Sequence, residues 1–254
     1  MQTVFITGAT SGIGMEFAQA YAAQGCRLIL VGRREDRLEK LRAETGTDCR
    51  LIRADLAEEE QCRKLLEEIS DEPVDIFINN AGFGTAGSFL ETDIDKETAM
   101  IRVNDAAMHI LFKGVLQKMQ ARGHGTILNV ASSAGLLPGG PYMAAYYASK
   151  AYVVSLTRAV AEELREKGSP VYVCALCPGP VNTEFNEHAD VEFALKGISA
   201  KRCVSECLSA MKRRRIIIVP TFLMKAAVFF QHFVPEPVLI RMVAGQQKKK
   251  IRPR

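Results

Sequence analysis

Tyr146 and Lys150 stand four positions apart, in a stretch that reads Tyr146-Tyr147-Ala148-Ser149-Lys150. Helical geometry puts two side chains with this spacing on one face. A free phenol, with a pKa of about 10, is a poor acid or base at neutral pH, and a neighbouring ammonium lowers the pKa of a phenol by favouring the phenolate. We therefore predict that Tyr146 exchanges a proton with a carbonyl or alcohol oxygen.

Serine residues precede this pair at the end of an apolar stretch, in the run Ser132-Ser133-Ala134-Gly135. A serine hydroxyl placed there can form a hydrogen bond with the same substrate oxygen and stabilise the charge that develops on it. A tyrosine and a lysine at this spacing also occur by chance on protein surfaces. The pair becomes informative because a serine and a glycine-rich turn precede it.

The turn between the first apolar stretch and the first helical stretch reads Thr7-Gly8-Ala9-Thr10-Ser11-Gly12-Ile13-Gly14. Glycine lets the backbone turn tightly and approach a pyrophosphate without an intervening Cβ atom. The amide groups and the dipole of the following helix then face the phosphates, and the hydroxyls of Thr10 and Ser11 add donors. We predict that the turn from Gly8 to Gly14 binds a dinucleotide.

The segment Gly32-Arg33-Arg34 stands where the second apolar stretch ends. An enzyme that prefers the unphosphorylated cofactor places an acid at this point, which holds the ribose 2′-hydroxyl. The sequence has no acid here, and a guanidinium is available to pair with a 2′-phosphate. We therefore predict NADP(H) rather than NAD(H) as the cofactor, with Arg33 as the main contact and Arg34 as a secondary one.

Apolar stretches alternate with helical ones from residue 3 to about residue 185. The predicted strands are 3–7, 27–31, 49–53, 74–79, 126–130 and 171–176, and the predicted helices are 13–24, 35–45, 58–70, 96–121 and 144–167. Strands that are apolar on both faces and alternate with helices indicate a parallel sheet covered on both sides. We predict a doubly wound, Rossmann-type α/β fold of one domain, an architecture that binds dinucleotides where its strands end.

These features resemble the short-chain dehydrogenase/reductase family, in its shorter branch, over roughly residues 3–185. The matching motifs, in chain order, are the turn from Thr7 to Gly14, Asn79-Asn80-Ala81-Gly82, Asn104, Ser132, Tyr146 with Lys150, and Pro178-Gly179. Because all of them occur in the expected order, a chance match is negligible.

The resemblance implies catalytic roles for four residues. Tyr146 would be the proton donor, and Lys150 would lower the pKa of the phenol and bind the nicotinamide ribose. Ser132 would bind the substrate carbonyl, and Asn104 would hold a water molecule that relays the proton.

The resemblance also implies contacts along the cofactor. Asp55 and Leu56 would contact the adenine, and Asn80 would stabilise the sheet beside the cofactor. Contacts at the nicotinamide end would come from Pro178, Val181 and Thr183.

The choice between Ser132 and Ser133 depends on the direction of counting. The spacing common in the family, counted back from Tyr146, gives Ser133. Counting forward from the strand residue Asn129, and reading Ser-x-Ala-Gly, gives Ser132. We favour Ser132, because loops absorb insertions more readily than strands do.

The composition limits the class of protein. Of the 254 residues 24% are charged, which excludes a polytopic membrane protein. The seven cysteines are an odd number and no secretory leader precedes the first strand, so we expect reduced thiols in a cytoplasmic protein. Cys174 and Cys177 have a zinc-like spacing, but there is no second such pair and the four histidines are scattered. We favour buried thiols and expect no metal site.

The pattern changes beyond residue 185, where we predict a helix over 187–213 and a strand over 215–219. Residues 212–254 hold eleven Lys and Arg and one acid, whereas the other 211 residues hold 22 basic and 28 acidic side chains. This balance suggests an anionic partner for the basic end. We divide the chain into a dinucleotide-binding and catalytic domain, 1–220, with a substrate loop at about 184–213, and an apolar and basic extension, 221–254.

The extension allows two interpretations. Its apolar run over 221–243 is interrupted by Lys225, Gln231, His232 and Glu236, so a transmembrane helix is not expected. In one interpretation the apolar pieces pack over the substrate cleft or against a second subunit of a homodimer or homotetramer. In the other they lie in a membrane interface, where basic residues flank them, and the protein is membrane-associated.

Together these features predict an NADP(H)-dependent oxidoreductase that transfers a hydride between nicotinamide and the carbonyl or alcohol of a hydrophobic substrate, with no nucleic-acid partner. Apolar side chains expected near the site, about half of them in the core, are Phe83, Phe89, Leu136, Leu137, Tyr142, Met143, Phe185 and Phe193. One alternative is a cofactor-binding scaffold or sensor without turnover, which the intact catalytic set disfavours. Another is an epimerase or dehydratase of the longer branch, whose glycine spacing differs.

Overall fold

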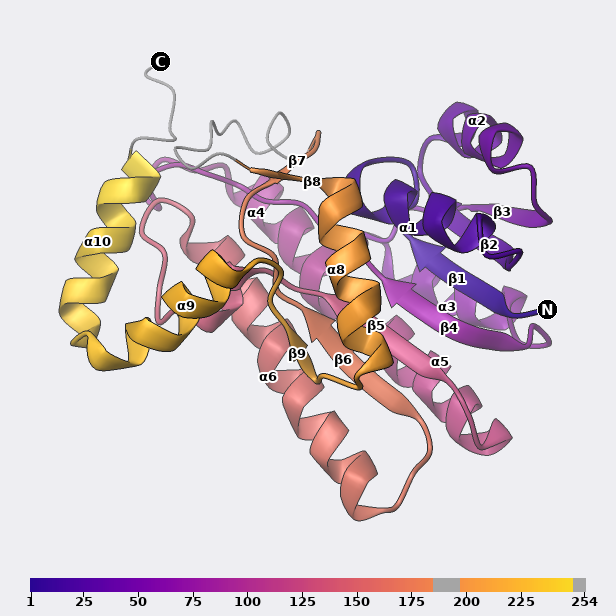
Figure 1. The fold of residues 1–254 in the computed structure, drawn as a ribbon. Helices are drawn as coiled ribbons and strands as arrows, with labels where there is room; N and C mark the ends of the chain where they lie inside the picture. The colour runs from indigo at the N-terminus through magenta and orange to yellow at the C-terminus, as the bar shows by residue number, and fades with distance from the viewer. Residues whose placement is uncertain (185–196, 249–254) are drawn as a thin grey trace.

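The computed structural model describes residues 1–184 and 197–248, in which strands and helices alternate along the chain (Figure 1). The strands of the N-terminal part are β1 (Thr3–Thr7), β2 (Arg27–Gly32), β3 (Cys49–Arg53), β4 (Val74–Asn79), β5 (Thr126–Val130) and β6 (Tyr172–Leu176). The helices between them are α1 (Gly12–Ala22), α2 (Glu35–Thr45), α3 (Glu59–Glu68), α4 (Ile94–Ile101), α5 (Met108–Arg122) and α6 (Ala144–Glu166). Every element predicted up to residue 176 is present, and the long helix is divided.

The central sheet has seven parallel strands in the order β3-β2-β1-β4-β5-β6-β9, where β9 is Ile217–Ile218. Strand order reverses between β1 and β4, because the chain crosses from one side of β1 to the other after β3. Such a reversal leaves a crevice at the carboxyl ends of the strands. The predicted doubly wound α/β fold is therefore confirmed.

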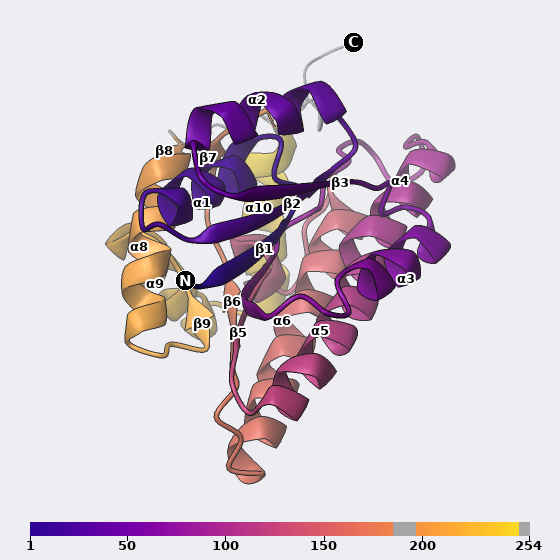
Figure 2. The same ribbon diagram turned by 90° about the vertical axis from the view of Figure 1, so that its right-hand side faces the viewer.

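Helices cover both faces of this sheet (Figure 2). On one face, Val4 and Ile6 of β1 belong to a core that includes Phe17 of α1 and Cys203 of α8 (Ala200–Lys212). On the other face, Phe5 belongs to a core formed with α3, α5 and α6. Neighbouring residues of one strand thus face different cores, which explains why the strands are apolar throughout.

The predicted helix over 96–121 is divided by a wide turn. The structure has α4, a π-helical segment over Arg102–Ala107, and then α5, without a break in the helical path. A π-helical segment is rare and often marks a functional site. Asn104, one of the predicted site residues, lies in this segment and is almost completely buried.

The chain after β6 differs most from the prediction. β7 (Val181–Asn182) pairs with β8 (Ile198–Ser199) in a small parallel sheet. Of the helix predicted over 187–213, only Ala200–Lys212 is helical in the described residues, as α8, and Ile198–Ser199 is the strand β8 instead. The strand predicted over 215–219 is present as the two residues of β9. Residues 185–196, with Phe185, Phe193 and part of the predicted substrate loop, lie outside the described residues.

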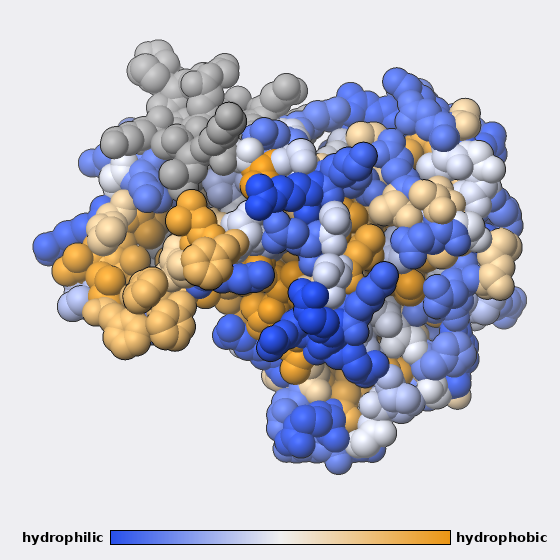
Figure 3. All heavy atoms as spheres, in the orientation of Figure 1, coloured by the Kyte–Doolittle hydropathy of each residue, from blue (hydrophilic) through white to orange (hydrophobic). Residues whose placement is uncertain are grey.

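The C-terminal residues form α9 (Phe222–Phe230), a 3-10 turn (Gln231–Phe233) and α10 (Glu236–Lys248). These helices lie together at one side of the molecule, and apolar side chains gather on their surface (Figure 3). Within residues 1–184 and 197–248, no helix is long and apolar enough to span a bilayer. The proposed division of the chain at residue 220 stays a prediction.

Candidate active site

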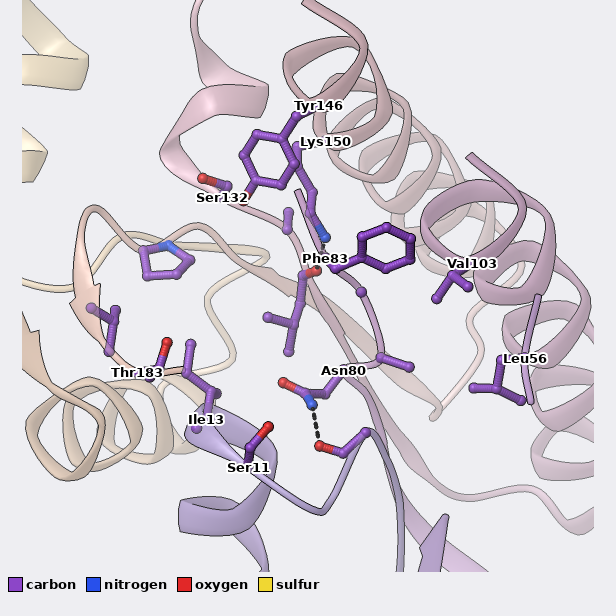
Figure 4. Close-up of a pocket in the computed structure, with 18 of the residues that line it drawn as sticks. Ser11, Ile13, Leu56, Asn80, Phe83, Val103, Ser132, Tyr146, Lys150 and Thr183 are labelled. Carbon is purple, nitrogen blue, oxygen red and sulfur yellow. Dashed lines mark hydrogen bonds between the residues drawn. The ribbon is translucent and has the colours of Figure 1, made fainter. Parts of the chain in front are cut away.

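A cavity of about 580 Å3 lies at the carboxyl ends of the strands, where the strand order reverses (Figure 4). The predicted residues that line it are Gly8, Thr10, Ser11, Gly12, Ile13, Arg33, Arg34, Asp55, Leu56, Asn80, Ser132, Tyr146, Lys150, Pro178, Val181 and Thr183. Gly14 and Asn104 lie behind this lining, in contact with Gly8 and Phe83 of the cavity wall. The fold thus gathers the predicted residues around one cavity.

The turn between β1 and α1 brings backbone atoms close to the cavity. Gly8 has a φ of +63°, in the left-handed region that glycine adopts without strain. A Cβ atom on Gly14 would lie 2.3 Å from the carbonyl oxygen of Gly8, so a side chain cannot fit there. The amide groups that open α1 consequently face the cavity, and this cradle fits the pyrophosphate of a dinucleotide.

Asn80 joins the two strand ends at the reversal point. Its side-chain amide donates hydrogen bonds to the carbonyl oxygens of Thr7, at 2.9 Å, and of Gly8, at 3.1 Å. The hydroxyl of Thr7 in turn accepts a hydrogen bond from the backbone N–H of Asn80 at 2.9 Å. This geometry agrees with the stabilising role that the family resemblance implies for Asn80.

The predicted adenine and nicotinamide contacts lie in the loops that follow β3 and β6. Asp55 and Leu56 line the cavity, and the carboxylate of Asp55 accepts a hydrogen bond from the backbone N–H of Ala57 at 3.0 Å. A Cβ atom on Gly12 would lie 3.1 Å from the side chain of Thr183, which brings the loop after β6 against the glycine turn. The two loops therefore border the cavity beside the predicted phosphate-binding turn.

The two arginines after β2 differ in their partners. The guanidinium of Arg34 donates to the hydroxyl of Thr10 at 3.2 Å and forms an ion pair with Glu184 at 3.5 Å. Arg37 of α2 forms a closer ion pair with the same carboxylate, at 2.7 Å. Arg33 is exposed, lines the cavity and has no ion pair with the described residues. Sequence reasoning missed Glu184, because it lies 150 residues from Arg34 in the chain.

Tyr146 and Lys150 lie on the buried face of α6. The ammonium of Lys150 is 5.9 Å from the centre of the Tyr146 ring and donates a hydrogen bond to the carbonyl oxygen of Val130 at 3.1 Å. The two side chains converge at the cavity, as the spacing predicted (Figure 4). The phenol of Tyr146 and the ammonium of Lys150 therefore lie beside the carboxyl end of β5, which carries Val130.

Burial shifts the pKa values of both groups. It raises the pKa of Tyr146 to about 12, although a hydrogen bond with Ser132 acts in the opposite direction. Burial also lowers the pKa of Lys150 to about 8, although the carboxylate of Asp105 counteracts this shift. The sequence predicted a lowered pKa for the phenol, and this direction is wrong for the protein alone, because removal from water outweighs the hydrogen bond with Ser132.

Ser132 is the serine that contacts the phenol. Its side chain forms a hydrogen bond with Tyr146, and its hydroxyl accepts another from the backbone N–H of Ala134 at 3.1 Å. Figure 4 shows Ser132 beside the ring of Tyr146. Ser133 also lines the cavity, and its backbone N–H donates to the carbonyl oxygen of Pro178 at 2.8 Å. This arrangement supports the count made from the strand.

Asn104 holds the loop after β4 against α6. Its amide donates to the carbonyl oxygen of Phe83 at 2.9 Å and to the hydroxyl of Ser149 at 3.1 Å, and its oxygen accepts from the N–H of Phe83 at 3.0 Å. A Cβ atom on Gly82 would lie 2.8 Å from the oxygen of Asn104 and 3.3 Å from the ammonium of Lys150. Asn104 is therefore next to Lys150, and its role toward a relay water stays a proposal.

Comparison with known proteins assigns this arrangement to a family. A family model described as short chain dehydrogenase matches residues 2–192. The chain belongs to the short chain dehydrogenase family. It is 38% identical over 184 residues to galactitol 2-dehydrogenase (L-tagatose-forming) of Cereibacter sphaeroides, which is 71% of each chain.

Solved short chain dehydrogenases have the same fold. A short-chain dehydrogenase from Sphingobium yanoikuyae in complex with NADPH has a TM-score of 0.81 and 28% identity, over 93% of this chain and 97% of that one. A family member from Burkholderia phymatum in complex with NAD has a TM-score of 0.83 and 26% identity, over 91% and 93%. The present short chain dehydrogenase is thus a nicotinamide-dependent oxidoreductase of alcohol or carbonyl groups.

The C-terminal helix of this short chain dehydrogenase adds a residue that sequence reasoning missed. Gln247 of α10 lines the cavity, is only 3% exposed, and donates a hydrogen bond to the hydroxyl of Tyr147 at 2.5 Å. Its side-chain oxygen is buried and has no hydrogen-bond partner among the described residues. No motif signals Gln247, because its contact with Tyr147 spans 100 residues of sequence.

The apolar side chains predicted near the site differ in where they lie. Phe83 and Met143 line the cavity. Leu136 and Leu137 are half-buried and pack against the core, Tyr142 is half-buried outside the cavity lining, and Phe89 is 68% exposed. The cavity wall of this short chain dehydrogenase is therefore less aromatic than the sequence suggested.

Six of the seven thiols are buried, and Cys49 is half-buried. Burial raises the pKa of Cys174 and of Cys177 to about 12, so neither thiol ionises at neutral pH. The prediction that Cys174 and Cys177 are buried is confirmed. Within residues 1–184 and 197–248, no three His, Cys, Asp or Glu side chains form a group that could hold a metal ion.

Proposed function

We propose that this short chain dehydrogenase is a catalytically active, NADP(H)-dependent oxidoreductase that interconverts a carbonyl and an alcohol on a largely apolar substrate. The observation that carries the proposal is the hydrogen bond between Ser132 and Tyr146, with the ammonium of Lys150 buried beside them. These groups line the same cavity as the glycine turn, so a dinucleotide on the turn and a substrate beside Tyr146 share one space.

The chain's own residues handle the proton and the substrate oxygen. The nicotinamide, when bound, supplies the hydride in reduction or takes it in oxidation. In reduction, the phenol of Tyr146 gives its proton to the substrate oxygen, and the hydroxyl of Ser132 donates a hydrogen bond to that oxygen. The Lys150 ammonium then stabilises the phenolate that remains.

A raised phenol pKa suits this direction. Burial keeps Tyr146 protonated at neutral pH, so the resting protein is ready to donate. We propose that Asn104, through Phe83 and Ser149, holds this part of the site in place and lies on the path by which the proton is replaced.

The preference for NADP(H) is supported by the charges after β2. Arg34 and Arg37 share the carboxylate of Glu184, and Arg33 adds a third cation beside the cavity. Arg33 has no ion pair with the described residues, so its guanidinium is available to a 2′-phosphate. The solved relatives hold NADPH in one case and NAD in the other, so the argument for NADP(H) depends on these arginines.

The cavity beside Tyr146 has a largely apolar wall and one polar group, the side chain of Gln247, and these features support a substrate class. Phe83, Val103 and Met143 supply apolar surface. The buried oxygen of Gln247 can accept a hydrogen bond from a hydroxyl on the substrate, away from the reacting carbon. We propose a hydroxylated but otherwise apolar ketone. The hydroxyl part of this proposal is supported by the Cereibacter relative, which is named for the polyhydroxylated substrate galactitol.

The same proposal places the enzyme in the cytoplasm as a homodimer or homotetramer. The seven unpaired thiols are consistent with a reducing compartment. Sedimentation equilibrium of the full chain measures the number of subunits.

Tyr146→Phe tests the proposed function. This change keeps the ring and removes the proton, so the rate of NADPH-dependent ketone reduction should fall by roughly 10²- to 10⁴-fold, the usual contribution of a general acid. Binding of NADPH, followed by its fluorescence, should be retained. Tyr152→Phe on the same helix is the control, because that hydroxyl bonds to His109 outside the cavity lining. Retained turnover in Tyr146→Phe would refute the proposed role of Tyr146, whereas no turnover in the unaltered protein would favour a sensor or scaffold.

A further inference from the structure

Large apolar side chains are exposed in unusual number on the two C-terminal helices. Seven of the fourteen large exposed apolar residues of the described chain lie within residues 222–242. We call them the C-terminal apolar face, and they are Phe222, Leu223, Phe229, Phe230, Phe233, Val238 and Met242. Phe222 is 85% exposed, Leu223 75% and Phe233 73%. Soluble monomers rarely expose a contiguous apolar surface of this kind without a function for it.

Three rings of this face form a cluster. The ring centres of Phe229 and Phe230 are 5.3 Å apart, and that of Phe233 lies 5.6 Å from the first and 6.5 Å from the second. All three are more than half exposed, so the cluster is on the outside of the protein. Figure 3 shows apolar surface spread over α9 and α10 where they project from the body.

Helix α9 has no fully buried residue, although all but one of its nine residues are apolar. Its contact with the body includes Met224, whose side chain lies 2.9 Å from where a Cβ atom of Gly179 would be. A helix that is apolar on all sides normally lies in a core or in lipid. α9 therefore has apolar surface that the described chain leaves uncovered.

Charge decides between the possible occupants of this face. Within residues 222–242 the exposed cations are Lys225 and Arg241 and the one acid is Glu236, and Lys225 also lies near the carboxylate of Glu206. Residues 212–254 carry eleven basic side chains and one acid in all. In a two-fold contact each surface meets its own copy, so a second subunit here would bring like charges together. An anionic lipid surface attracts the same cations while its acyl region accepts the phenylalanine rings.

We infer that the C-terminal apolar face binds peripherally to an anionic membrane, with the cluster of Phe229, Phe230 and Phe233 inserted at the level of the headgroups. Neither helix crosses the bilayer. α9 and α10 are 9 and 13 residues long, and both would lie along the interface.

The opposite side of α10 faces the active site. Val243 packs in the cluster that contains Tyr146 and Met143, and Gln247 lines the cavity, whereas Met242 of the same helix is 57% exposed. One helix thus separates the cavity from the proposed lipid contact. A substrate dissolved in the membrane would have a short path to the cavity past α10, and this part of the inference rests on the proposed function.

Co-sedimentation of the full-length protein with vesicles tests the membrane contact independently of catalysis. The vesicles are phosphatidylglycerol mixed with phosphatidylcholine, or phosphatidylcholine alone, each at low and at high salt. We expect binding to the anionic vesicles at low salt and weaker binding at high salt, because salt screens the charges. No binding to the anionic vesicles, or equal binding to both kinds at low salt, would overturn the inference.

Substitution of the ring cluster identifies the surface involved. The triple variant Phe229→Ser, Phe230→Ser, Phe233→Ser should bind the anionic vesicles at least about tenfold more weakly, because apolar burial in lipid is lost. The matched control, Leu90→Ser with Ile94→Ser, removes exposed apolar side chains elsewhere and should bind like the unaltered protein. Circular dichroism confirms that both variants are folded.

The oligomeric state provides the contrary outcome. If light scattering shows a dimer that the triple variant dissociates, the face belongs to a second subunit and the inference is wrong. Equal vesicle binding by the triple variant and the control would also overturn it. Lys225→Glu with Arg241→Glu should reduce binding to anionic vesicles only, and unchanged binding in that variant contradicts the role of charge.

Discussion

Glu184 forms an ion pair with Arg34, with 3.5 Å between the guanidinium nitrogen and the carboxylate oxygen, and shares its carboxylate with Arg37. Hydrogen bonding to Arg37 is the main cause of a lowered pKa for Glu184, so this acid is charged at neutral pH. Two of the three arginines near the predicted 2′-phosphate position are therefore partly neutralised. Arg33 forms no ion pair with any of the described residues. It is therefore the cation on which the preference for NADP(H) should depend most.

Arg33→Asp should weaken NADPH binding strongly and NADH binding little. Loss of a charged hydrogen bond costs about 1.5–3 kcal/mol, and the introduced carboxylate adds repulsion of the phosphate. Dissociation constants from nucleotide fluorescence measure both effects. Arg63→Asp on α3, which removes an exposed arginine outside the cavity lining, is the control. Equal NADPH affinity in Arg33→Asp and the unaltered protein would refute the assignment.

The reverse change is expected from Glu184→Gln. It frees Arg34 and Arg37 from their shared partner, so NADPH should bind about two- to fivefold more tightly, the range expected from an exposed ion pair. Weaker NADPH binding in this variant would show that Glu184 acts chiefly by holding the two arginines in position.

Ser132→Ala should lower the rate of carbonyl reduction far more than Ser133→Ala. The hydroxyl of Ser132 bonds with Tyr146, and loss of a donor to the reacting oxygen lowers kcat by roughly 10²- to 10³-fold. Steady-state kinetics of the two variants with one ketone and NADPH make the comparison. The opposite ranking would show that the count back from Tyr146 was the correct one.

The rate of reduction should decline as the pH rises through about 8, the pKa to which burial lowers Lys150. Below that pH the amine is charged and can stabilise the phenolate, and above it this charge is lost. The phenol, with a pKa of about 12, stays protonated throughout this interval. A profile of kcat/KM against pH measures the midpoint.

Asp105→Asn should move that midpoint to lower pH, because the carboxylate of Asp105 raises the pKa of Lys150. Asp105 is partly buried in the π-helical segment, and burial raises its own pKa to about 6. A midpoint that does not move in the variant would show that the decline in rate arises from a group other than Lys150.

Gln247→Leu should reduce the preference for a hydroxylated ketone over the same ketone without its hydroxyl. A site that pairs with a substrate hydroxyl typically gains about 0.5–1.5 kcal/mol from that hydrogen bond. The ratio of kcat/KM for the two ketones measures the preference. Gln231→Leu is the control, because Gln231 is also buried and has an unpartnered oxygen among the described residues, but does not line the cavity. An unchanged ratio in Gln247→Leu would show that Gln247 does not form a hydrogen bond with the substrate hydroxyl.

Features set by local geometry were predictable from the sequence. The glycine turn was recognisable because β1 must turn tightly before α1, and the convergence of Tyr146 with Lys150 follows from the pitch of one helix. The alternation of strands and helices along the chain likewise predicted the parallel sheet, because it is visible in the local pattern of apolar residues. The π-helical segment around Asn104 was not predicted, because the hydrophobic periodicity over 96–121 is that of one continuous helix.

Partners that meet only through the fold could not be predicted. Glu184 reaches Arg34 across 150 residues and Gln247 reaches Tyr147 across 100, and no local spacing relates the members of either pair. The direction of the pKa shift of Tyr146 depends on how much water the packed protein excludes, which the neighbouring lysine alone does not reveal.

The sequence by itself therefore determined the order of the elements, the strand ends that carry chemistry, and the spacing of the residues on α6, since each depends on backbone geometry over a few residues. The tertiary structure added the contact between Ser132 and Tyr146, in agreement with the serine favoured by the count from the strand. It alone decided that Gln247 of α10 lines the cavity. It also decided that Phe229, Phe230 and Phe233 stay exposed. These outcomes depend on which surfaces pack together and which remain in contact with water, and that is settled only when distant segments compete for the same core.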